Sequence, residues 1–184
     1  YLKKAEIPIV LENIKKNLSR CVCTLRPRSE GGLFIGKEDE RKSILRLIAE
    51  YNPFLLDVEF NTIQKDKKLA SYLKKSKCKL LISWHDFNKT PNKLQLESRF
   101  NKMRKFSNIV KIVTVAKNVS DASRVLSLYS IKSKEKTIAF CMGEQGKFSR
   151  ILCMHLGSPF TYVSLGKAIA PGQFSVDEIK SLQT

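Results

Sequence analysis

The sequence predicts an α/β fold, and within that class a closed (β/α)8 barrel (TIM barrel) of which about six of the eight strands are present. Short apolar runs rich in β-branched residues alternate with longer amphipathic runs, which favours parallel strands joined by helices. No G-x-G-x-x-G follows any of these runs, so an open dinucleotide-binding sheet is disfavoured. Polar side chains stand near the C-terminal ends of the runs, where a barrel assembles its active site.

The elements follow from the apolar pattern in chain order. We expect strands at 20–26, 54–60, 78–84, 108–115, 136–142 and 159–163. We expect helices at 4–17, 37–51, 63–75, 91–106, 120–129 and 148–156. Pro8 should lie in the first turn of the first helix or before it, and Ser175 with Glu178 has the spacing of a capping box that starts a last helix. At 184 residues, 1–184 should form a single barrel domain.

Charge and cysteine content narrow the class of protein. The net charge of +17 would suit a polyanion partner, but the lysines are dispersed along the chain, as expected for solvated helix faces. The five cysteines are odd in number and lie mostly in apolar runs, which favours reduced thiols in a cytoplasmic protein. No apolar run reaches the ~20 residues of a membrane span, and no cysteine or histidine spacing indicates a metal.

Two residues carry the strongest chemical signal. Lys111 interrupts an apolar strand, where desolvation would lower the amine pKa and leave a nucleophile toward ketones. A structural ion pair with Asp57 or Glu59 is the alternative. His85 follows the preceding strand, where it is either a structural histidine or an acid/base partner for chemistry at the amine.

Three loops add candidate binding groups. The segment 26–32 places Arg26 and Glu30 beside a Gly-Gly pair, either as ligands or as an ordinary turn. The segment 143–150 joins a strand to a helix and ends on Arg150, either as a site that suits a carboxylate or as an ordinary connection. The segment 170–173 is placed where barrels often carry a mobile loop.

Taken in series, these segments resemble the type I 3-dehydroquinate dehydratases over nearly the whole chain. The matching stretches are TLRPRSEGG at 24–32, DVE at 57–59, SWHDFNKTP at 83–91, KIVTVA at 111–116, MGEQGKFSR at 142–150, GSPFTY at 157–162 and APGQ at 170–173. The resemblance implies a hydro-lyase of the shikimate pathway, acting in aromatic amino acid and chorismate biosynthesis. It converts 3-dehydroquinate to 3-dehydroshikimate without cofactor or metal.

The resemblance also implies a role for each candidate residue. Lys111 would form a Schiff base with the substrate ketone and His85 would act as general acid/base. Arg150 would bind the substrate carboxylate. The remaining assignments are Arg26 and Gln173 to hydroxyl or carboxylate oxygens, Glu30 to the orientation of His85, Met142 and Phe87 to the pocket wall, and Asp57 and Glu59 to supporting positions. A homodimer is expected by the same resemblance.

The sequence departs from the family pattern at two places. Ile169 stands where the family usually has a small hydroxyl residue, and the E-x-R-x-D segment of an earlier strand is absent. We therefore expect two N-terminal strands to be missing from the chain. Two other functions compete: another Schiff-base barrel enzyme, such as a class I aldolase, and a non-catalytic basic domain that binds nucleic acid.

Overall fold

The computed structural model describes residues 4–131 and 136–182, and the chain divides into two compact units, Tyr1–Ile82 and Ser83–Thr184. Five strands make one sheet in chain order, β1-β2-β3-β4-β5. The pairing of β1 with β2 is parallel, and so is the pairing of β4 with β5. The α/β class with parallel strands is therefore confirmed.

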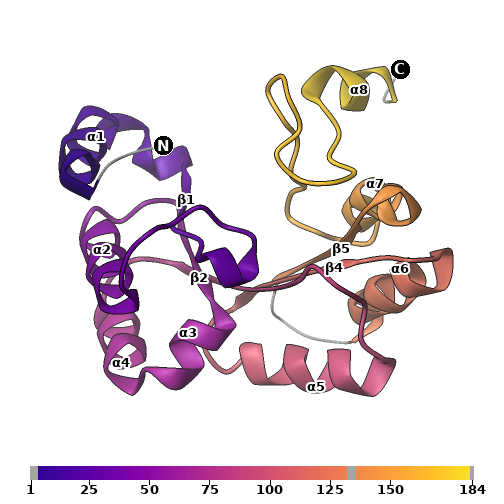
Figure 1. The fold of residues 1–184 in the computed structure, drawn as a ribbon, viewed down its shortest axis with the longest axis horizontal. Coiled ribbons are helices and arrows are strands. Elements are labelled where there is room, and N and C mark those ends of the chain that lie inside the picture. Colours follow the sequence, from indigo (N-terminus) through magenta and orange to yellow (C-terminus); the bar gives the residue numbers. More distant parts are fainter. Residues whose placement is uncertain (1–3, 132–135, 183–184) are drawn as a thin grey trace. The chain divides into compact units, whose positions relative to one another are not determined.

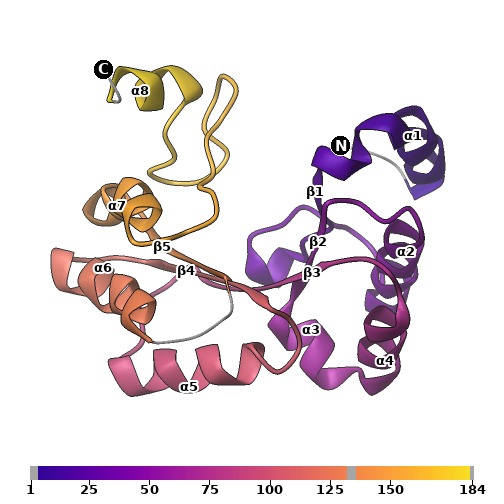
Figure 2. The ribbon, with the colours of Figure 1, turned by 180° about the vertical axis from the view of Figure 1, so that it is seen from behind.

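The first unit carries two full strands and their helices (Figure 1). Its elements are η1 Lys4–Glu6, α1 Ile7–Asn13, η2 Lys15–Arg20, β1 Val22–Thr24, η3 Arg28–Glu30, α2 Glu38–Glu50, β2 Leu55–Glu59, α3 Phe60–Lys65 and α4 Lys67–Lys75. In the β1–β2 register Val22 pairs with Leu55 and Thr24 with Asp57. The helices α2 and α4 lie side by side in both views (Figures 1 and 2).

The second unit begins within β3, which spans Leu80–Asp86. The elements that follow are α5 Lys93–Met103, β4 Ile109–Val115, α6 Val119–Leu126, η4 Ser127–Ser130, β5 Lys136–Met142, η5 Glu144–Gly146, α7 Ser149–His155 and α8 Val176–Ser181. The helix α6 packs on β5 and contacts both α5 and α7. Strands β4 and β5 pair over their full length, from Ile109 with Lys136 to Val115 with Met142.

The strands form the core of each unit. All five residues of β2 are buried, and so are five consecutive residues of β4 and the last six of β5. Burial on both faces explains why these runs are nearly continuous in apolar residues, because helices cover a parallel sheet from outside. A charged side chain inside such a strand needs a partner or a function, and this applies to Asp57, Glu59 and Lys111.

Several expected boundaries agree closely with the structure. The strand at 136–142 has the predicted limits, and the capping box is present: the Ser175 hydroxyl accepts from the Glu178 N–H, and the Glu178 carboxylate accepts from the Ser175 N–H. Pro8 lies in the first turn of α1, as expected. All five thiols are free.

Three expected elements are wrong. The segment 159–163 is not a strand; among the described residues nearby, only Ser164 forms a bridge, an isolated one with Ser175. Pro159 has no N–H to give to a ladder, and Phe160 and Tyr162 pack edge to face instead, with ring centroids 5.6 Å apart. Aromatic and β-branched content alone had produced the strand pattern.

The expected helix at 63–75 is two helices. Asp66 has an extended backbone, with φ −115° and ψ 91°, and its side chain accepts a hydrogen bond from the Leu69 N–H, so it caps α4. The expected helix at 4–17 is α-helical only over Ile7–Asn13, with 3-10 turns on either side. Short capping side chains such as Asp compete with helix continuity by bonding to backbone N–H groups, and this accounts for the break at Asp66.

Candidate active site

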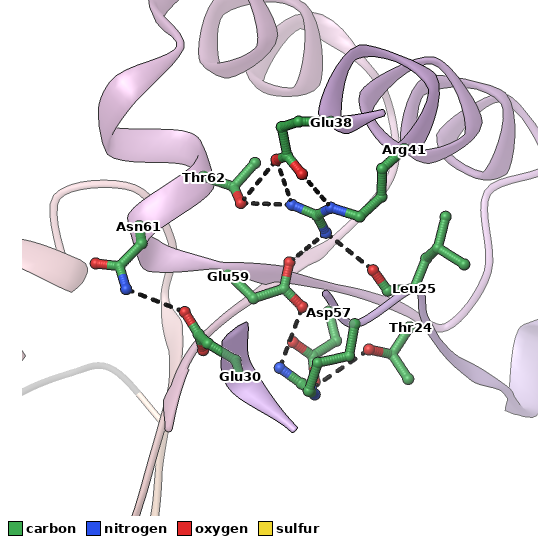
Figure 3. Close-up of polar contacts among 10 residues, drawn as sticks. Thr24, Leu25, Glu30, Glu38, Arg41, Asp57, Glu59, Asn61 and Thr62 are labelled. Carbon is green, nitrogen blue, oxygen red and sulfur yellow. Dashed lines mark hydrogen bonds and ion pairs between the residues drawn. The ribbon is translucent and has the colours of Figure 1, made fainter. Parts of the chain in front are cut away.

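The guanidinium of Arg26 contacts two buried carboxylates of the first unit, those of Asp57 and Glu59, which Figure 3 labels. Its Nη2 is 2.6 Å from Asp57 Oδ2, and its Nη1 is 3.2 Å from Glu59 Oε1. Nη2 also donates to the Thr24 hydroxyl at 3.3 Å. The parallel register of β1 and β2 brings Thr24 opposite Asp57, which gathers these groups at the C-terminal ends of both strands. Asp57 and Glu59 thus hold the Arg26 guanidinium by ion pairs, and their role in supporting the site stays a prediction.

A second arginine that sequence reasoning overlooked completes this cluster. Arg41 of α2 is fully buried, and its Nη1 lies 2.6 Å from Glu59 Oε2. In the sequence, Arg41 and Glu38 look like an ordinary surface pair one helical turn apart. The only signal was indirect: a buried carboxylate on β2 requires cations, and the nearest helix must supply them.

The turn after Arg26 is shaped by glycine. A Cβ built on Gly32 would lie 1.9 Å from the Arg26 carbonyl oxygen, so no other residue fits there, and Gly31 ends η3 with φ 77°. This tight turn places Glu30, which is 3% exposed, where Asn61 Nδ2 donates to its Oε1 at 3.1 Å. The Gly-Gly pair therefore fixes the positions of both candidate ligands of this loop.

Lys111 lies in the middle of β4 and is 7% exposed. Its Nζ lies over the ring of Tyr162, 4.1 Å from the ring centroid. The face of an aromatic ring attracts a cation, so the ring holds the amine in place inside a strand that is otherwise apolar. Tyr162 belongs to the expected motif GSPFTY, but no role had been assigned to it.

His85 lies near the end of β3 and is half-buried. Its ring stacks with that of Phe87, with centroids 6.3 Å apart and planes 26° apart. The loop that follows is fixed by Asp86, whose Oδ1 accepts from the N–H groups of Asn88 and Lys89. Phe87, expected in the pocket wall, is 41% exposed and contacts the histidine ring.

Arg150 lies in the first turn of α7 and is 2% exposed. Its Nη2 donates to the Pro171 carbonyl at 3.2 Å, and its guanidinium lies 4.6 Å from the centroid of the Phe140 ring. Among the described residues, no carboxylate bonds to it, and its Nε has no hydrogen-bond partner. Burial lowers the pKa of Arg150 to about 10. A buried guanidinium of this kind has the charge and the donor geometry that suit an anion.

The 170–173 loop packs against the end of β5. The Pro171 carbonyl accepts from both Gly143 N–H, at 3.3 Å, and Arg150. A Cβ on Gly172 would lie 2.9 Å from the Gly143 carbonyl oxygen. The Gln173 Oε1 accepts from the Ile169 and Ala170 N–H groups, at 3.0 and 3.3 Å.

The neighbouring positions differ in exposure. Met142 ends β5 and is 2% exposed, whereas Ile169, at the position of the family's hydroxyl residue, is 90% exposed. Across residues 4–131 and 136–182, no group of three His, Cys, Asp or Glu side chains could hold a metal ion. Over the same residues, no helix has the length and apolar character needed to cross a bilayer.

Comparison with known proteins finds relatives of one kind. The chain is 42% identical over 158 residues to a 3-dehydroquinate dehydratase of Pyrobaculum aerophilum, covering 85% of the chain and 50% of that protein. It is 36% identical over 165 residues to that of Methanocaldococcus jannaschii, covering 88% of the chain and 74% of that protein. The solved type I enzyme of Clostridium difficile, with covalently modified comenic acid, superposes with a TM-score of 0.85 at 26% identity, covering 98% of the chain and 74% of that protein.

The match to a single family extends over nearly the whole sequence. The family model of type I 3-dehydroquinase matches residues 2–184. The fold of the solved relatives is the TIM barrel expected from the sequence. The chain therefore belongs to the type I 3-dehydroquinase family, the hydro-lyases that dehydrate 3-dehydroquinate in the shikimate pathway.

Proposed function

We propose that this chain dehydrates 3-dehydroquinate through a Schiff base on Lys111, with His85 as general acid and base. The observation that carries the proposal is the burial of Lys111 in β4. An amine in apolar surroundings gives up its proton more readily than one in water, and the neutral amine adds to a ketone.

The reaction then follows in balanced steps. The Lys111 Nζ adds to the C3 carbonyl and one water leaves, which gives a protonated imine. His85 takes a proton from C2, and the electron pair moves into the iminium to give an enamine. The enamine expels the C1 hydroxyl, which His85 protonates to water. Hydrolysis of the second iminium returns the amine and releases 3-dehydroshikimate, so one water is lost overall.

Tyr162 supports the cationic species in these steps. The same ring face that attracts the ammonium of Lys111 attracts the iminium formed on the same nitrogen. His85, with one face of its ring stacked on Phe87, is restrained in its rotation. Restrained groups favour reaction because less freedom is lost on the way to the transition state.

The two candidate arginines suit different parts of the substrate. Arg150 has a carbonyl and an aromatic ring as neighbours, so its charge is available to the substrate carboxylate. Arg26 forms ion pairs with Asp57 and Glu59. Because these carboxylates already balance its charge, Arg26 suits neutral hydroxyl oxygens of the substrate. Gln173 would donate from its amide group to a substrate oxygen. Glu30 would orient His85, and Met142 and Phe87 would line the pocket.

Borohydride trapping tests the proposal directly. We would mix the chain with 3-dehydroquinate and sodium borohydride and measure the intact mass. The reduced adduct should appear in the unmodified chain and in Lys93→Ala, an exposed lysine of α5, and should be absent from Lys111→Ala. A folded protein that gives no adduct, or an adduct that persists in Lys111→Ala, would rule out this mechanism. The adduct in the Clostridium difficile structure, with covalently modified comenic acid, supports the choice of assay.

We also propose that residues 1–184 belong to one barrel domain, and that the protein acts as a cytoplasmic homodimer without a nucleic-acid partner. Light scattering of the purified protein tests the dimer. Coincident unfolding transitions by circular dichroism and by the fluorescence of Trp84 test the single domain. Five cysteines without a disulfide between them suit a reducing compartment, which supports the cytoplasmic assignment.

A further inference from the structure

Arg41 makes an unusually complete set of hydrogen bonds. A guanidinium has five N–H donors, and those of Arg41 meet five acceptors. Nε and Nη2 donate to the two oxygens of Glu38 at 2.9 and 2.7 Å, and Nη2 donates to the Thr62 hydroxyl at 2.5 Å. Nη1 donates to the Leu25 carbonyl at 2.9 Å and to Glu59 Oε2 at 2.6 Å. Figure 3 shows these groups converging on one side chain.

Two of these acceptors, the Leu25 carbonyl and the Glu59 carboxylate, are directly connected to Arg26. The Leu25 carbonyl belongs to the peptide group that links Leu25 to Arg26. Glu59 uses its second oxygen, Oε1, to accept from Arg26 Nη1 at 3.2 Å. Arg41 therefore fixes the backbone before Arg26 and the carboxylate that holds the Arg26 side chain. The other bonds, to Glu38 and Thr62, hold Arg41 itself from the opposite side.

The charge balance at Glu59 depends on both arginines. The side chain is fully buried, and burial raises the pKa of the Glu59 carboxyl against the opposing effect of Arg41 and Arg26. Without Arg41, the buried Glu59 carboxylate would be paired with Arg26 alone. It would then take up a proton or pull Arg26 closer, because an uncompensated buried charge is costly. Either response changes which N–H groups Arg26 presents.

We propose that Arg41 is a positioning residue for substrate binding, acting through the Leu25 carbonyl and Glu59 to orient the guanidinium of Arg26. This inference rests on the proposed role of Arg26 as a substrate ligand. Lysine cannot replace Arg41, because an ammonium has three donors and no planar fork. Glu38→Gln is the milder perturbation. The Glu38 carboxylate is about half exposed, and it bonds to Arg41 on the side away from Arg26.

A double-mutant cycle tests the inference with KM and kcat for 3-dehydroquinate as readouts. Arg41→Lys and Arg26→Lys should each raise KM roughly tenfold, the factor expected for losing one hydrogen bond to a charged group. The double variant should be no worse than Arg26→Lys alone, because Arg41 acts only through Arg26. Arg124→Lys, a matched control whose guanidinium bonds Asp121, Thr90 and Pro91, should leave KM unchanged and combine additively with Arg26→Lys.

Each outcome bears on a different claim. Additive effects of Arg41→Lys and Arg26→Lys, or an unchanged KM in Arg41→Lys, would overturn the inference while leaving Arg26 as a ligand. An unchanged KM in Arg26→Lys would overturn both the inference and the proposed role of Arg26. If Arg41→Lys does not fold, Glu38→Gln takes its place in the cycle: a raised KM that is non-additive with Arg26→Lys supports the inference, and an unchanged or additive KM refutes it.

Discussion

Arg150→Met should leave the ligand-free protein as stable as before or more stable, although it removes a buried arginine. The substitution keeps a long unbranched side chain but deletes a charge that has no carboxylate partner among the described residues. Because burial lowers the pKa of Arg150 to about 10, the unfolded chain holds the proton more tightly than the folded chain does. The cost of the charge is therefore present at pH 7 and is relieved only as the pH rises through about 10.

The size of the effect follows from that difference in pKa. The lowering of the pKa of Arg150 from the usual arginine value to about 10 corresponds to a cost of about 3 kcal/mol, at about 1.4 kcal/mol for each pH unit. Against it stand the Pro171 hydrogen bond and the contact with Phe140, each of which contributes roughly 1 kcal/mol. The net gain in Arg150→Met should be between zero and about 2 kcal/mol, or up to about 8 °C in melting temperature.

Urea unfolding with and without 3-dehydroshikimate measures both arms of the prediction. A ligand at a hundredfold its Kd stabilises the unmodified protein by about 2.7 kcal/mol, and this shift should disappear in Arg150→Met. Arg124→Met, which loses a paired arginine, should instead be destabilised by roughly 1–2 kcal/mol and keep its ligand response. If Arg150→Met loses as much stability as Arg124→Met, or still responds fully to ligand, Arg150 is a structural residue and the reasoning fails.

Three other substitutions have defined outcomes. Tyr162→Leu removes the ring face over the Lys111 amine and should lower kcat roughly 2- to 30-fold in steady-state assays. This is the range of a cation–π contribution of about 0.5–2 kcal/mol. An unchanged kcat would show that the ring does not contribute to catalysis. Phe100→Ala empties a fully buried position in α5 and should cost about 3–5 kcal/mol in urea unfolding; a loss below about 1 kcal/mol would contradict tight packing there. Ser175→Ala removes the cap of α8 and should cost about 1 kcal/mol, with Ser181→Ala, at the far end of the helix, as its control.

The sequence predicted best those features that depend on short stretches of chain. The strand at Lys136–Met142 and the capping box at Ser175 follow from local pattern and hydrogen bonding, so they could be located without tertiary information. The same holds for the clustering of Arg26, Asp57 and Glu59, because adjacent parallel strands bring their C-terminal ends together. The family resemblance of the motifs is confirmed by the family match.

What the sequence could not predict depends on contacts between distant segments. Tyr162 lies about fifty residues after Lys111, and nothing in its neighbours indicates that its ring covers an amine. The apolar content of 159–163 suggested a strand, but the segment is not a strand, and the rings of Phe160 and Tyr162 pack against each other. Arg41 looks like half of a helix-surface pair until the fold places Glu59 and the Leu25 carbonyl beside it.

The carbonyl of Pro171, in the 170–173 loop, accepts from two groups outside that loop, the Gly143 N–H and the Arg150 guanidinium. Lifting of the loop would therefore break both hydrogen bonds at the same moment, because one acceptor serves both donors. In the proposed function, a substrate carboxylate would take the place of the Pro171 carbonyl as the acceptor for Arg150. Release of the product would return Arg150 to Pro171, so the proposal connects the seating of the 170–173 loop with the occupancy of the site.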